Sequence, residues 1–452
     1  MTKNHVYIFF ISIFFFISGP VFAASDPQKD LVNLGSAIYN DLNLSLNQNQ
    51  SCMTCHHSSA GFADPANRIS PALLPVSEGS ILTLFGGRNA PTASYAGFNP
   101  IFHYDVAEGL FRGGLFWDGR ATGMDVTDTG DLGSGPTGDP LADQAKGPFG
   151  NAVEMALTWD NTGVLTEVAV VGKIQTSDYA DKFEKVFGPN AFANVMVAYN
   201  NASLAIAAFE RSKKLNKFNS KFDKFVQEQG GDVSDFGVEY VGGFRNYVGP
   251  PPGFKSKYFS YDEADGLAIF NADSYTQLEN TQMGDNGGMC YLCHLTTNHV
   301  VAADDPNQPL NGPVPGIYNP LLTDFTFDNL GIPVNPQIAL LIGDAQDQDL
   351  GLGGQAAQLN AAYGSVYNSL VEDGKFKVSS LRNLSRTAPY SHNGFFATIY
   401  DIVHFYNTRD VPTAVWPAPE VSANVNVSEL GNLGLTLQQE QKLVMFLETL
   451  DN

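Results

Sequence analysis

The placement of the cysteines is the feature that most constrains what this chain of 452 residues can fold into. All four cysteines fall into two copies of the pentapeptide C-x-x-C-H, at residues 52–56 and 290–294. Two thiols at this spacing can reach two vinyl groups of one porphyrin while the adjacent imidazole reaches the iron, so the motif is typical of covalent haem c attachment. Chance would produce on the order of 10⁻³ such matches in a chain of this composition. The sequence therefore predicts two covalently bound haem c groups.

In each motif the two cysteines are predicted to bond to the porphyrin and the histidine to bind the iron. The predicted thioether-forming residues and proximal iron ligands are Cys52, Cys55, Cys290, Cys293, His56 and His294. Two disulfides are an alternative in an exported protein, and zinc is another, although zinc would need a further pair of ligands that no spacing here supplies. Among the other histidines, His392 is expected to be buried and hydrogen-bonded, whereas His57 and His299 are expected to be exposed.

The first residues have the pattern of a secretory signal peptide. Lys3 precedes an apolar run at residues 6–17, and small residues follow before Ala24. About a dozen apolar residues fall short of the ~20 that a membrane-spanning helix needs, so an uncleaved anchor is the weaker alternative. We therefore expect residues 1–23 to be removed, no membrane span in the mature chain, and a periplasmic location.

The charge balance disfavours some partners. With 47 acidic and 25 basic side chains the formal net charge is −22, which argues against nucleic acid as a partner. The charge suits attraction to a cationic partner, although a solvated anionic surface explains it equally well. Hydrophobic residues make up 43% of the chain, enough for a packed core, while 44 glycines and 25 prolines indicate many loops.

Apolar periodicity predicts a mostly α-helical protein. A helical pattern leads into each haem motif, at residues 29–40 and 260–271, the second opening with a capping box formed by Ser260 and Glu263. Further amphipathic stretches lie at residues 164–187, 194–212, 397–406 and 436–450. Strand signals are sparse. The expected irregular, solvated connections are residues 121–143, 230–256 and 300–320.

These elements predict two cytochrome c-like haem modules packed together, with long irregular loops. We assign residues 24–205 to an N-terminal haem domain and residues 206–452 to a C-terminal haem domain that ends in the helix at 436–450. The only internal duplication is the haem module itself.

Several segments together resemble the bacterial di-haem cytochrome c peroxidase and MauG family. Besides the two haem motifs, they are residues 87–92 (GRNAPT), 116–120 (FWDGR), 144–155, 207–211 (AAFER), 329–333 (NLGIP) and 375–407. The resemblance covers nearly the whole mature chain and implies that the first haem is the peroxide site and the second passes or stores electrons. The stretch between Trp117 and Gln144 is longer than usual in the family, which leaves the substrate open.

The resemblance also assigns a peroxide pocket. Glu154 resembles the distal acid–base residue, and Gln144 and Pro148 resemble residues that line the same pocket. Cleavage of peroxide requires a group that takes a proton from one oxygen and returns it to the departing one, and a carboxylate can do both. Trp117 resembles a relay between the haems. The alternatives are an exposed acid at a helix start for Glu154 and a core aromatic for Trp117.

Two departures from the conventional peroxidases point toward the MauG type. Tyr406 stands where those enzymes have a methionine ligand to the second haem, and an anionic phenolate lowers the iron potential where a thioether raises it. Residues 58–102 contain no histidine, whereas conventional members carry one there that blocks the first haem. The first haem is therefore expected to be open to peroxide without prior reduction. The resemblance further implies one calcium ion, bound by the Asn89 side chain and the carbonyl groups of Thr387 and Pro389.

We therefore expect a periplasmic di-haem oxidoreductase that uses hydrogen peroxide to oxidise a partner protein, as a monomer or homodimer. One alternative is a conventional cytochrome c peroxidase that draws electrons from a small cytochrome or cupredoxin. Another is a di-haem electron carrier or redox sensor without enzymatic activity, although the pocket of Gln144, Pro148 and Glu154 speaks against it.

Overall fold

The computed structural model describes residues 26–124, 137–160, 162–278, 286–296, 320–343, 348–364 and 368–452. The expected signal peptide, His299, nearly all of the 300–320 connection and the middle of the 121–143 connection lie outside the described residues. The described chain is mostly helical, as predicted, with a few short two-stranded sheets. No helix in these ranges combines the length and the apolar composition that crossing a bilayer demands.

The helices are distributed along the whole described chain. In the first half they are α1 (Pro27–Tyr39), α2 (Cys52–Cys55), α3 (Pro65–Ile69), α4 (Pro140–Gly150), α5 (Thr166–Gln175), α6 (Ala180–Phe187) and α7 (Val195–Glu210). In the second half they are α8 (Lys221–Glu228), α9 (Tyr261–Asn271), α10 (Pro336–Ile342), α11 (Ala356–Tyr363), α12 (Ser369–Glu372), α13 (Ile399–Thr408) and α14 (Leu437–Glu448). Short 3₁₀ turns lie at Leu42–Leu44, Ser58–Ala60, Ala96–Phe98, Cys290–Leu292, Leu352–Gln355 and Leu384–Arg386.

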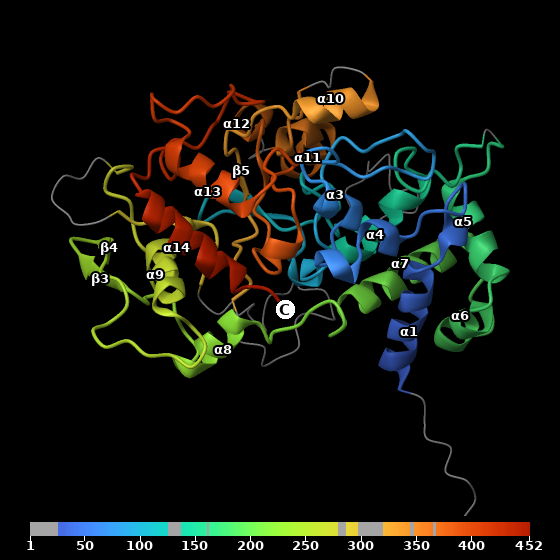
Figure 1. Ribbon diagram of the computed structural model, residues 1–452. Coiled ribbons are helices and arrows are strands. Elements are labelled where there is room, and N and C mark those ends of the chain that lie inside the picture. The colour runs from blue at the N-terminus through green and yellow to red at the C-terminus, as the bar shows by residue number, and fades with distance from the viewer. Residues whose placement is uncertain are drawn as a thin grey trace, which may run out of the picture.

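The helices that lead into the two haem motifs are packed in the same way. In Figure 1, α1, α5, α6 and α7 gather on one side of the molecule, and α9, α13 and α14 on the other. Helix α1 crosses α7 at Gly35, where any Cβ would collide with the carbonyl oxygen of Ala205. Helix α9 crosses α14 at Gly266, where a Cβ would collide with the carbonyl oxygen of Lys442. A glycine in each leading helix therefore lets two backbones touch.

Two hydrophobic cores follow from these crossings. One core draws on residues between Leu34 and Leu215, and the other on residues between Phe222 and Leu450. The predicted division after residue 205 falls inside α7, whose last turn still packs into the first core through Phe209. The assignment of two haem domains stays a prediction.

The sheets are three antiparallel pairs. They are β1 (His103–Asp105) with β2 (Leu110–Arg112), β3 (Val238–Val241) with β4 (Phe244–Tyr247), and β5 (Phe327–Asp328) with β6 (Phe376–Lys377). The β3–β4 hairpin corrects the expectation that residues 230–256 are wholly irregular. Gly242 and Gly243, both at positive φ, form its turn between two short strands that carry valine and aromatic residues, a recognisable hairpin signal.

Two other expectations need correction. The amphipathic stretch at residues 164–187 is two helices, α5 and α6, separated by a turn in which Ser177 accepts the N–H of Tyr179. The supposedly solvated connection at residues 121–143 ends inside α4, and Asp143 is buried with its carboxylate 3.1 Å from the ammonium group of Lys146. An acidic segment that was expected to be exposed to solvent therefore contains a buried ion pair.

Candidate functional site

The first C-x-x-C-H motif presents its imidazole for iron ligation. Cys52 and Cys55 lie at the two ends of α2, and His56 follows as its C-cap. His56 Nδ1 lies 3.2 Å from the carbonyl oxygen of Phe62, which leaves Nε2 to the iron. Burial lowers the pKa of His56, so the neutral imidazole that a metal requires is favoured.

The second motif repeats this arrangement on a different local structure. Cys290 starts a 3₁₀ turn rather than an α-helix, and Cys293 ends it. His294 Nδ1 lies 2.8 Å from the carbonyl oxygen of Leu322, and burial lowers the pKa of this imidazole as well. All four cysteines are free of disulfides, which removes the disulfide alternative from the structure. We refer to the haems expected at residues 52–56 and 290–294 as haem 1 and haem 2.

A single cavity of about 910 Å³ connects the two motifs. All the predicted haem-binding, catalytic and calcium-binding residues line it: Cys52, Cys55, His56, Asn89, Trp117, Gln144, Pro148, Glu154, Cys290, Cys293, His294, Thr387, Pro389 and Tyr406. The structure thus brings together residues more than 300 positions apart in sequence around a space that two porphyrins would fill.

The end of α4 positions Glu154. Pro140 begins this helix and Asp139 caps it, and near its other end the carbonyl oxygen of Pro148 accepts the N–H of Met155, which turns the chain back. Glu154 therefore follows a helix end and lines the cavity, contrary to the alternative of an exposed acid at a helix start. Asn151 Nδ2 donates to Glu154 Oε1 at 2.7 Å.

The surroundings of Glu154 set its affinity for protons. Burial raises the pKa of this carboxyl group, while the charge of Arg120 and the hydrogen bond from Asn151 oppose part of the shift. A buried carboxyl group of raised pKa that lines a cavity is a candidate for general acid–base chemistry. Sequence reasoning missed Asn151, although an asparagine three residues before a candidate acid in a turn is a usable signal.

Glu210, the last residue of α7, is a second carboxyl group at this end of the cavity that was not predicted. It is only 5% exposed, and its Oε2 has no hydrogen-bond partner among the described residues. Burial raises its pKa to about 8, and the charge of Arg211 offsets only part of that effect. Glu210 is therefore a buried carboxyl group that favours its neutral form.

Trp117 is held between the two halves of the chain. Its indole N–H donates to the carbonyl oxygen of Asn89 at 2.8 Å, and its own carbonyl oxygen accepts the N–H of Lys377 on β6. The Asn89 N–H in turn donates to the carbonyl oxygen of His392. This position in the shared cavity fits a residue between two haems, although it leaves the relay role a prediction.

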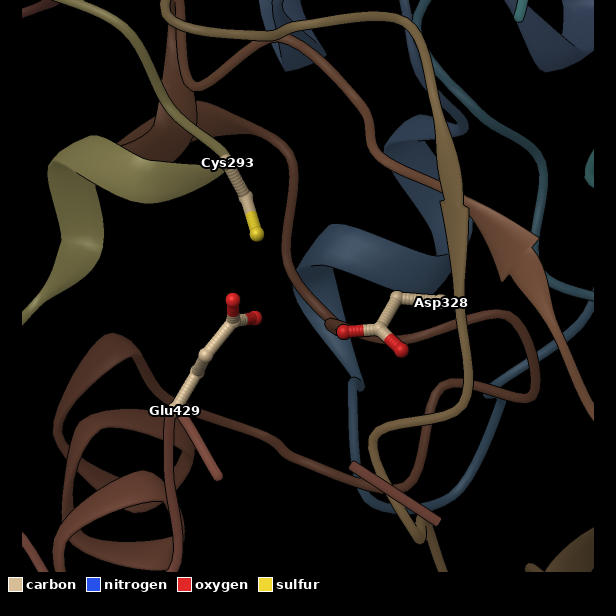
Figure 2. Close-up of side chains that lie close together, drawn as sticks. All are labelled: Cys293, Asp328 and Glu429. Atoms are coloured by element: carbon tan, nitrogen blue, oxygen red, sulfur yellow. The ribbon is translucent and has the colours of Figure 1, made fainter. Parts of the chain in front are cut away.

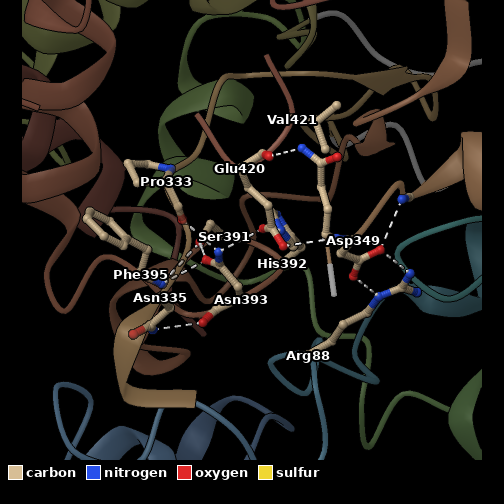
Figure 3. A network of polar contacts seen from close by, with 12 residues as sticks. Arg88, Pro333, Asn335, Asp349, Ser391, His392, Asn393, Phe395, Glu420 and Val421 are labelled. Carbon is tan, nitrogen blue, oxygen red and sulfur yellow. Dashed lines mark hydrogen bonds and ion pairs between the residues drawn. The ribbon is translucent and has the colours of Figure 1, made fainter. Parts of the chain in front are cut away.

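A buried polar network surrounds this position (Figure 3). His392 is 3% exposed, and its Nε2 lies 3.0 Å from Glu420 Oε2, which confirms it as a buried hydrogen-bonding residue. Its ring stacks on Phe376 at a centroid distance of 3.6 Å. The other carboxylate oxygen of Glu420 accepts the N–H of Asp349, and Asp349 forms a bidentate pair with Arg88. The network thus links residue 88 to the C-terminal half.

Two further histidines, His57 and His404, are engaged away from iron. His57 is half-buried rather than exposed, and its Nδ1 accepts the N–H of Ser59. His404 pairs with Glu440 at 2.9 Å on the face of α13 opposite the cavity-lining Tyr406 side.

Tyr406 reaches the cavity from α13. A capping box formed by Thr398 and Asp401 starts this helix, and Val403 and Tyr406 lie one turn apart on the side that lines the cavity. Burial raises the pKa of Tyr406, and the Cys293 and Cys290 thiols and Asp328 add to the effect. A cation beside the oxygen would stabilise the phenolate, and the iron of haem 2 would supply one.

The predicted calcium ligands are compatible with a hard cation. Asn89 is 6% exposed, and its Nδ2 donates to the carbonyl oxygen of Pro75, which leaves Oδ1 available as a ligand. Thr387 and Pro389 lie on the loop after the last 3₁₀ turn and line the same cavity as Asn89. Oxygen-only donors of this kind suit calcium, and the ion stays a prediction.

The motifs and their shared cavity are those of a di-haem protein whose cavity is lined by buried carboxyl groups. Comparison with known proteins specifies the class. Residues 29–231 match the sequence model of the di-haem cytochrome c peroxidases. The methylamine utilization protein MauG of Paracoccus denitrificans is 30% identical over 442 residues, which cover 94% of this chain and 89% of that protein. Cytochrome c551 peroxidase of Nitrosomonas europaea is 25% identical over 392 residues, which cover 85% of this chain and 75% of that protein.

Solved structures agree at the level of the fold. The diheme peroxidase BthA of Burkholderia thailandensis superposes with a TM-score of 0.64 at 24% identity, covering 95% of this chain and 89% of that one. The chain belongs to the di-haem cytochrome c peroxidase family, and it is a haem peroxidase-type oxidoreductase.

Proposed function

We propose that this protein is a MauG-type member of its family, which uses hydrogen peroxide to oxidise a partner protein in the periplasm. The observation that carries the proposal is the position of Tyr406, which lines the cavity beside the second haem motif at the place where conventional members have methionine. In this proposal haem c is attached through the four motif cysteines, and one calcium ion is bound at Asn89, Thr387 and Pro389.

The first pocket has the groups that peroxide reduction needs. Haem 1, when bound, supplies the iron at which peroxide reacts. Glu154 accepts a proton from one peroxide oxygen and returns it to the departing oxygen, and Asn151 fixes the direction of its carboxyl group. Gln144 and Pro148 line the pocket beside it. Since residues 58–102 contain no histidine, this segment offers no imidazole to close the distal face.

The second pocket is suited to retain an oxidising equivalent. The Tyr406 phenolate is an anionic ligand, which lowers the potential of the iron that it binds. Trp117 lies in the cavity that both motifs share and would connect the two sites. The substrate is then an external protein side chain, and the anionic chain suits a cationic partner surface.

The proposal is tested by spectroscopy of the ferric holoprotein, followed by addition of peroxide without a reductant. We expect one high-spin haem and one low-spin haem with histidine–tyrosine ligation, and a rapid absorbance change of both. Histidine–methionine or histidine–histidine ligation of haem 2, or a ferric protein inert to peroxide, would contradict the MauG-type assignment.

The similarity to a named cytochrome c551 peroxidase keeps a second function in consideration. In that case the protein reduces peroxide with electrons from a small cytochrome or cupredoxin. Rapid steady-state oxidation of a reduced small cytochrome c by peroxide would favour this function, and activity that appears only after reduction of haem 2 would strengthen it.

A further inference from the structure

Two carboxylates beside haem 2 have no role in the proposed function. Asp328, on β5, and Glu429, in the segment before α14, both line the cavity. Each places a carboxylate oxygen within 4.8 Å of the Cys293 sulfur and of the other carboxylate (Figure 2). They come from segments about 100 residues apart, so no local sequence pattern predicts that these two carboxylates lie together.

Asn426 holds this pair in place without neutralising it. Its Nδ2 lies 2.7 Å from Asp328 Oδ2 and 2.7 Å from Glu429 Oε2. Its Oδ1 accepts the N–H groups of Ser428 and Glu429, so the amide cannot flip without losing these bonds. Because an amide is an uncharged donor, the carboxylates are positioned while their negative charge remains.

The nearby basic side chains are engaged elsewhere. Arg409 pairs with Asp410 and donates to the carbonyl oxygens of Leu330 and Asn426, and Lys375 lies 3.0 Å from Glu372. Within the described ranges, no ion pair joins Asp328 or Glu429 to a lysine or arginine. Burial raises the pKa of Asp328, and the charge of Glu429 adds to the effect, so the two groups are coupled and share their negative charge.

A metal site is the competing interpretation of the three residues in Figure 2. A free Cys293 thiolate would be an effective ligand for a soft metal. In a C-x-x-C-H motif, however, this sulfur forms a thioether to the porphyrin, which leaves only the two carboxylates. The charge of the pair then acts on the haem to which Cys293 is bonded.

We propose that Asp328 and Glu429 form a fixed anionic pair that selectively lowers the reduction potential of haem 2. A negative charge buried near a redox centre stabilises its oxidised, more positive form, and the effect is strong where water is excluded. The pair acts in the same direction as the Tyr406 phenolate. The inference rests on the proposed function, since it explains how the second site retains an oxidising equivalent.

The test compares the holoprotein of the double variant Asp328→Asn/Glu429→Gln with the wild type by spectroelectrochemical titration of each haem, with both single variants titrated in parallel. Both substitutions keep an oxygen that accepts the Asn426 N–H, so only the charge is removed. Glu239→Gln, at an exposed position on β3 that does not line the cavity, removes one surface carboxylate and serves as the control. Haem content and the ligation spectrum of haem 2 are measured in parallel.

We expect the double variant to shift the haem 2 reduction equilibrium at least about tenfold toward the reduced form, ~59 mV for one electron, with haem 1 and the control unchanged. An unshifted haem 2, or equal shifts at both haems, would overturn the inference. So would calorimetry in which the wild type binds one Ca²⁺ more than Glu429→Gln does. If the double variant fails to retain haem, the larger of the two single-variant shifts decides. If the reduction potential of haem 2 does not shift but its histidine–tyrosine ligation is kept, only this inference fails. If the ligation of haem 2 is different, the MauG-type assignment fails.

Discussion

Single side chains determine the chemistry of the first pocket. The Glu154 carboxyl group lies in a turn that the Pro148 carbonyl oxygen organises, and Asn151 fixes its direction. Its burial stabilises the protonated form relative to water, whereas the charge of Arg120 stabilises the carboxylate form. The two forms of one group can thus serve both proton transfers.

Replacing Glu154 by glutamine removes this proton exchange and keeps the bond from Asn151. We expect the rate of the reaction with peroxide to fall by roughly 10²–10⁴, as for loss of a general acid–base group. Stopped-flow absorbance of the ferric holoprotein measures it. Glu239→Gln should react at the wild-type rate, and an unchanged rate in Glu154→Gln would remove this residue from the mechanism.

Glu210 predicts a pH dependence of stability. Its pKa is raised to about 8 in the folded protein from 4.5, so between these values the folded state binds a proton that the unfolded state does not. Stability therefore decreases as the pH rises through this range. Glu210→Gln, which is neutral at every pH, should match the wild type near the lower end of the range.

At the upper end, Glu210→Gln should be the more stable protein by ~2–4 kcal/mol. Thermal unfolding of both holoproteins across the range measures the difference. Parallel curves for wild type and variant would show that Glu210 does not titrate as its burial indicates.

The residues of the site were predictable to different degrees. Cys52 and His56 follow from one motif, and Glu154 follows from a resemblance whose pocket the cavity supports. Glu210 and the pair of Asp328 and Glu429 were not predictable, because an isolated acid in a sequence shows neither its burial nor its neighbours. Only the fold brings such groups to a haem.

At the scale of secondary structure, α1 and α9 each pack against a partner helix, α7 and α14, through close backbone contact at a glycine. Gly266→Ala should force α9 away from α14, because the new methyl group meets the Lys442 carbonyl oxygen rather than a flexible side chain. Overpacking of this kind costs about 1–3 kcal/mol, measured by denaturant unfolding of the holoprotein.

Gly172→Ala is the matched control for that substitution. Gly172 lies within α5, and no atom comes within 4 Å of a Cβ built there. Alanine is the better helix former by about 1 kcal/mol, so this variant should be as stable as the wild type or slightly more stable. Equal effects of the two substitutions would mean that the helix crossing at Gly266 is not tight.

About half of the helices were predictable, and α7, α13 and α14 lie within two or three residues of the bounds that their amphipathic patterns indicated. The capping box of Ser260 and Glu263 also starts α9 as predicted. The β3–β4 hairpin was missed, because its glycine pair lies in a segment otherwise typical of a loop. The break between α5 and α6 was missed because the apolar pattern continues across the turn.

At the scale of the whole molecule, Arg88 joins the two halves. Its guanidinium group lies 2.6 Å from Asp118 and 2.7 Å from Asp349, and Asp118 is 2% exposed. Arg88→Met leaves two carboxylates without this partner and should cost ~2–4 kcal/mol. Lys185→Met, which removes an ion pair to Asp30 at a side chain 52% exposed, should cost ~0–1 kcal/mol.

Urea unfolding of both variants, monitored separately at the two haem bands, distinguishes these cases. We expect Arg88→Met to destabilise both bands together. Loss confined to one band would show that the halves unfold independently and that the Arg88 pairs do not couple them. The sequence did not predict this connection, because Arg88 and Asp349 lie 261 positions apart.

The common cavity has a consequence for biogenesis. Its walls come from both halves, so the cavity is complete only once the chain from Cys52 to Tyr406 has folded. If haem is attached covalently as proposed, attachment would act on an incompletely closed polypeptide, and each porphyrin would become part of the wall against which the other packs. A strain unable to modify one motif should then accumulate little of the singly loaded protein, because such a chain would keep an unfilled interior and be more easily degraded by proteases.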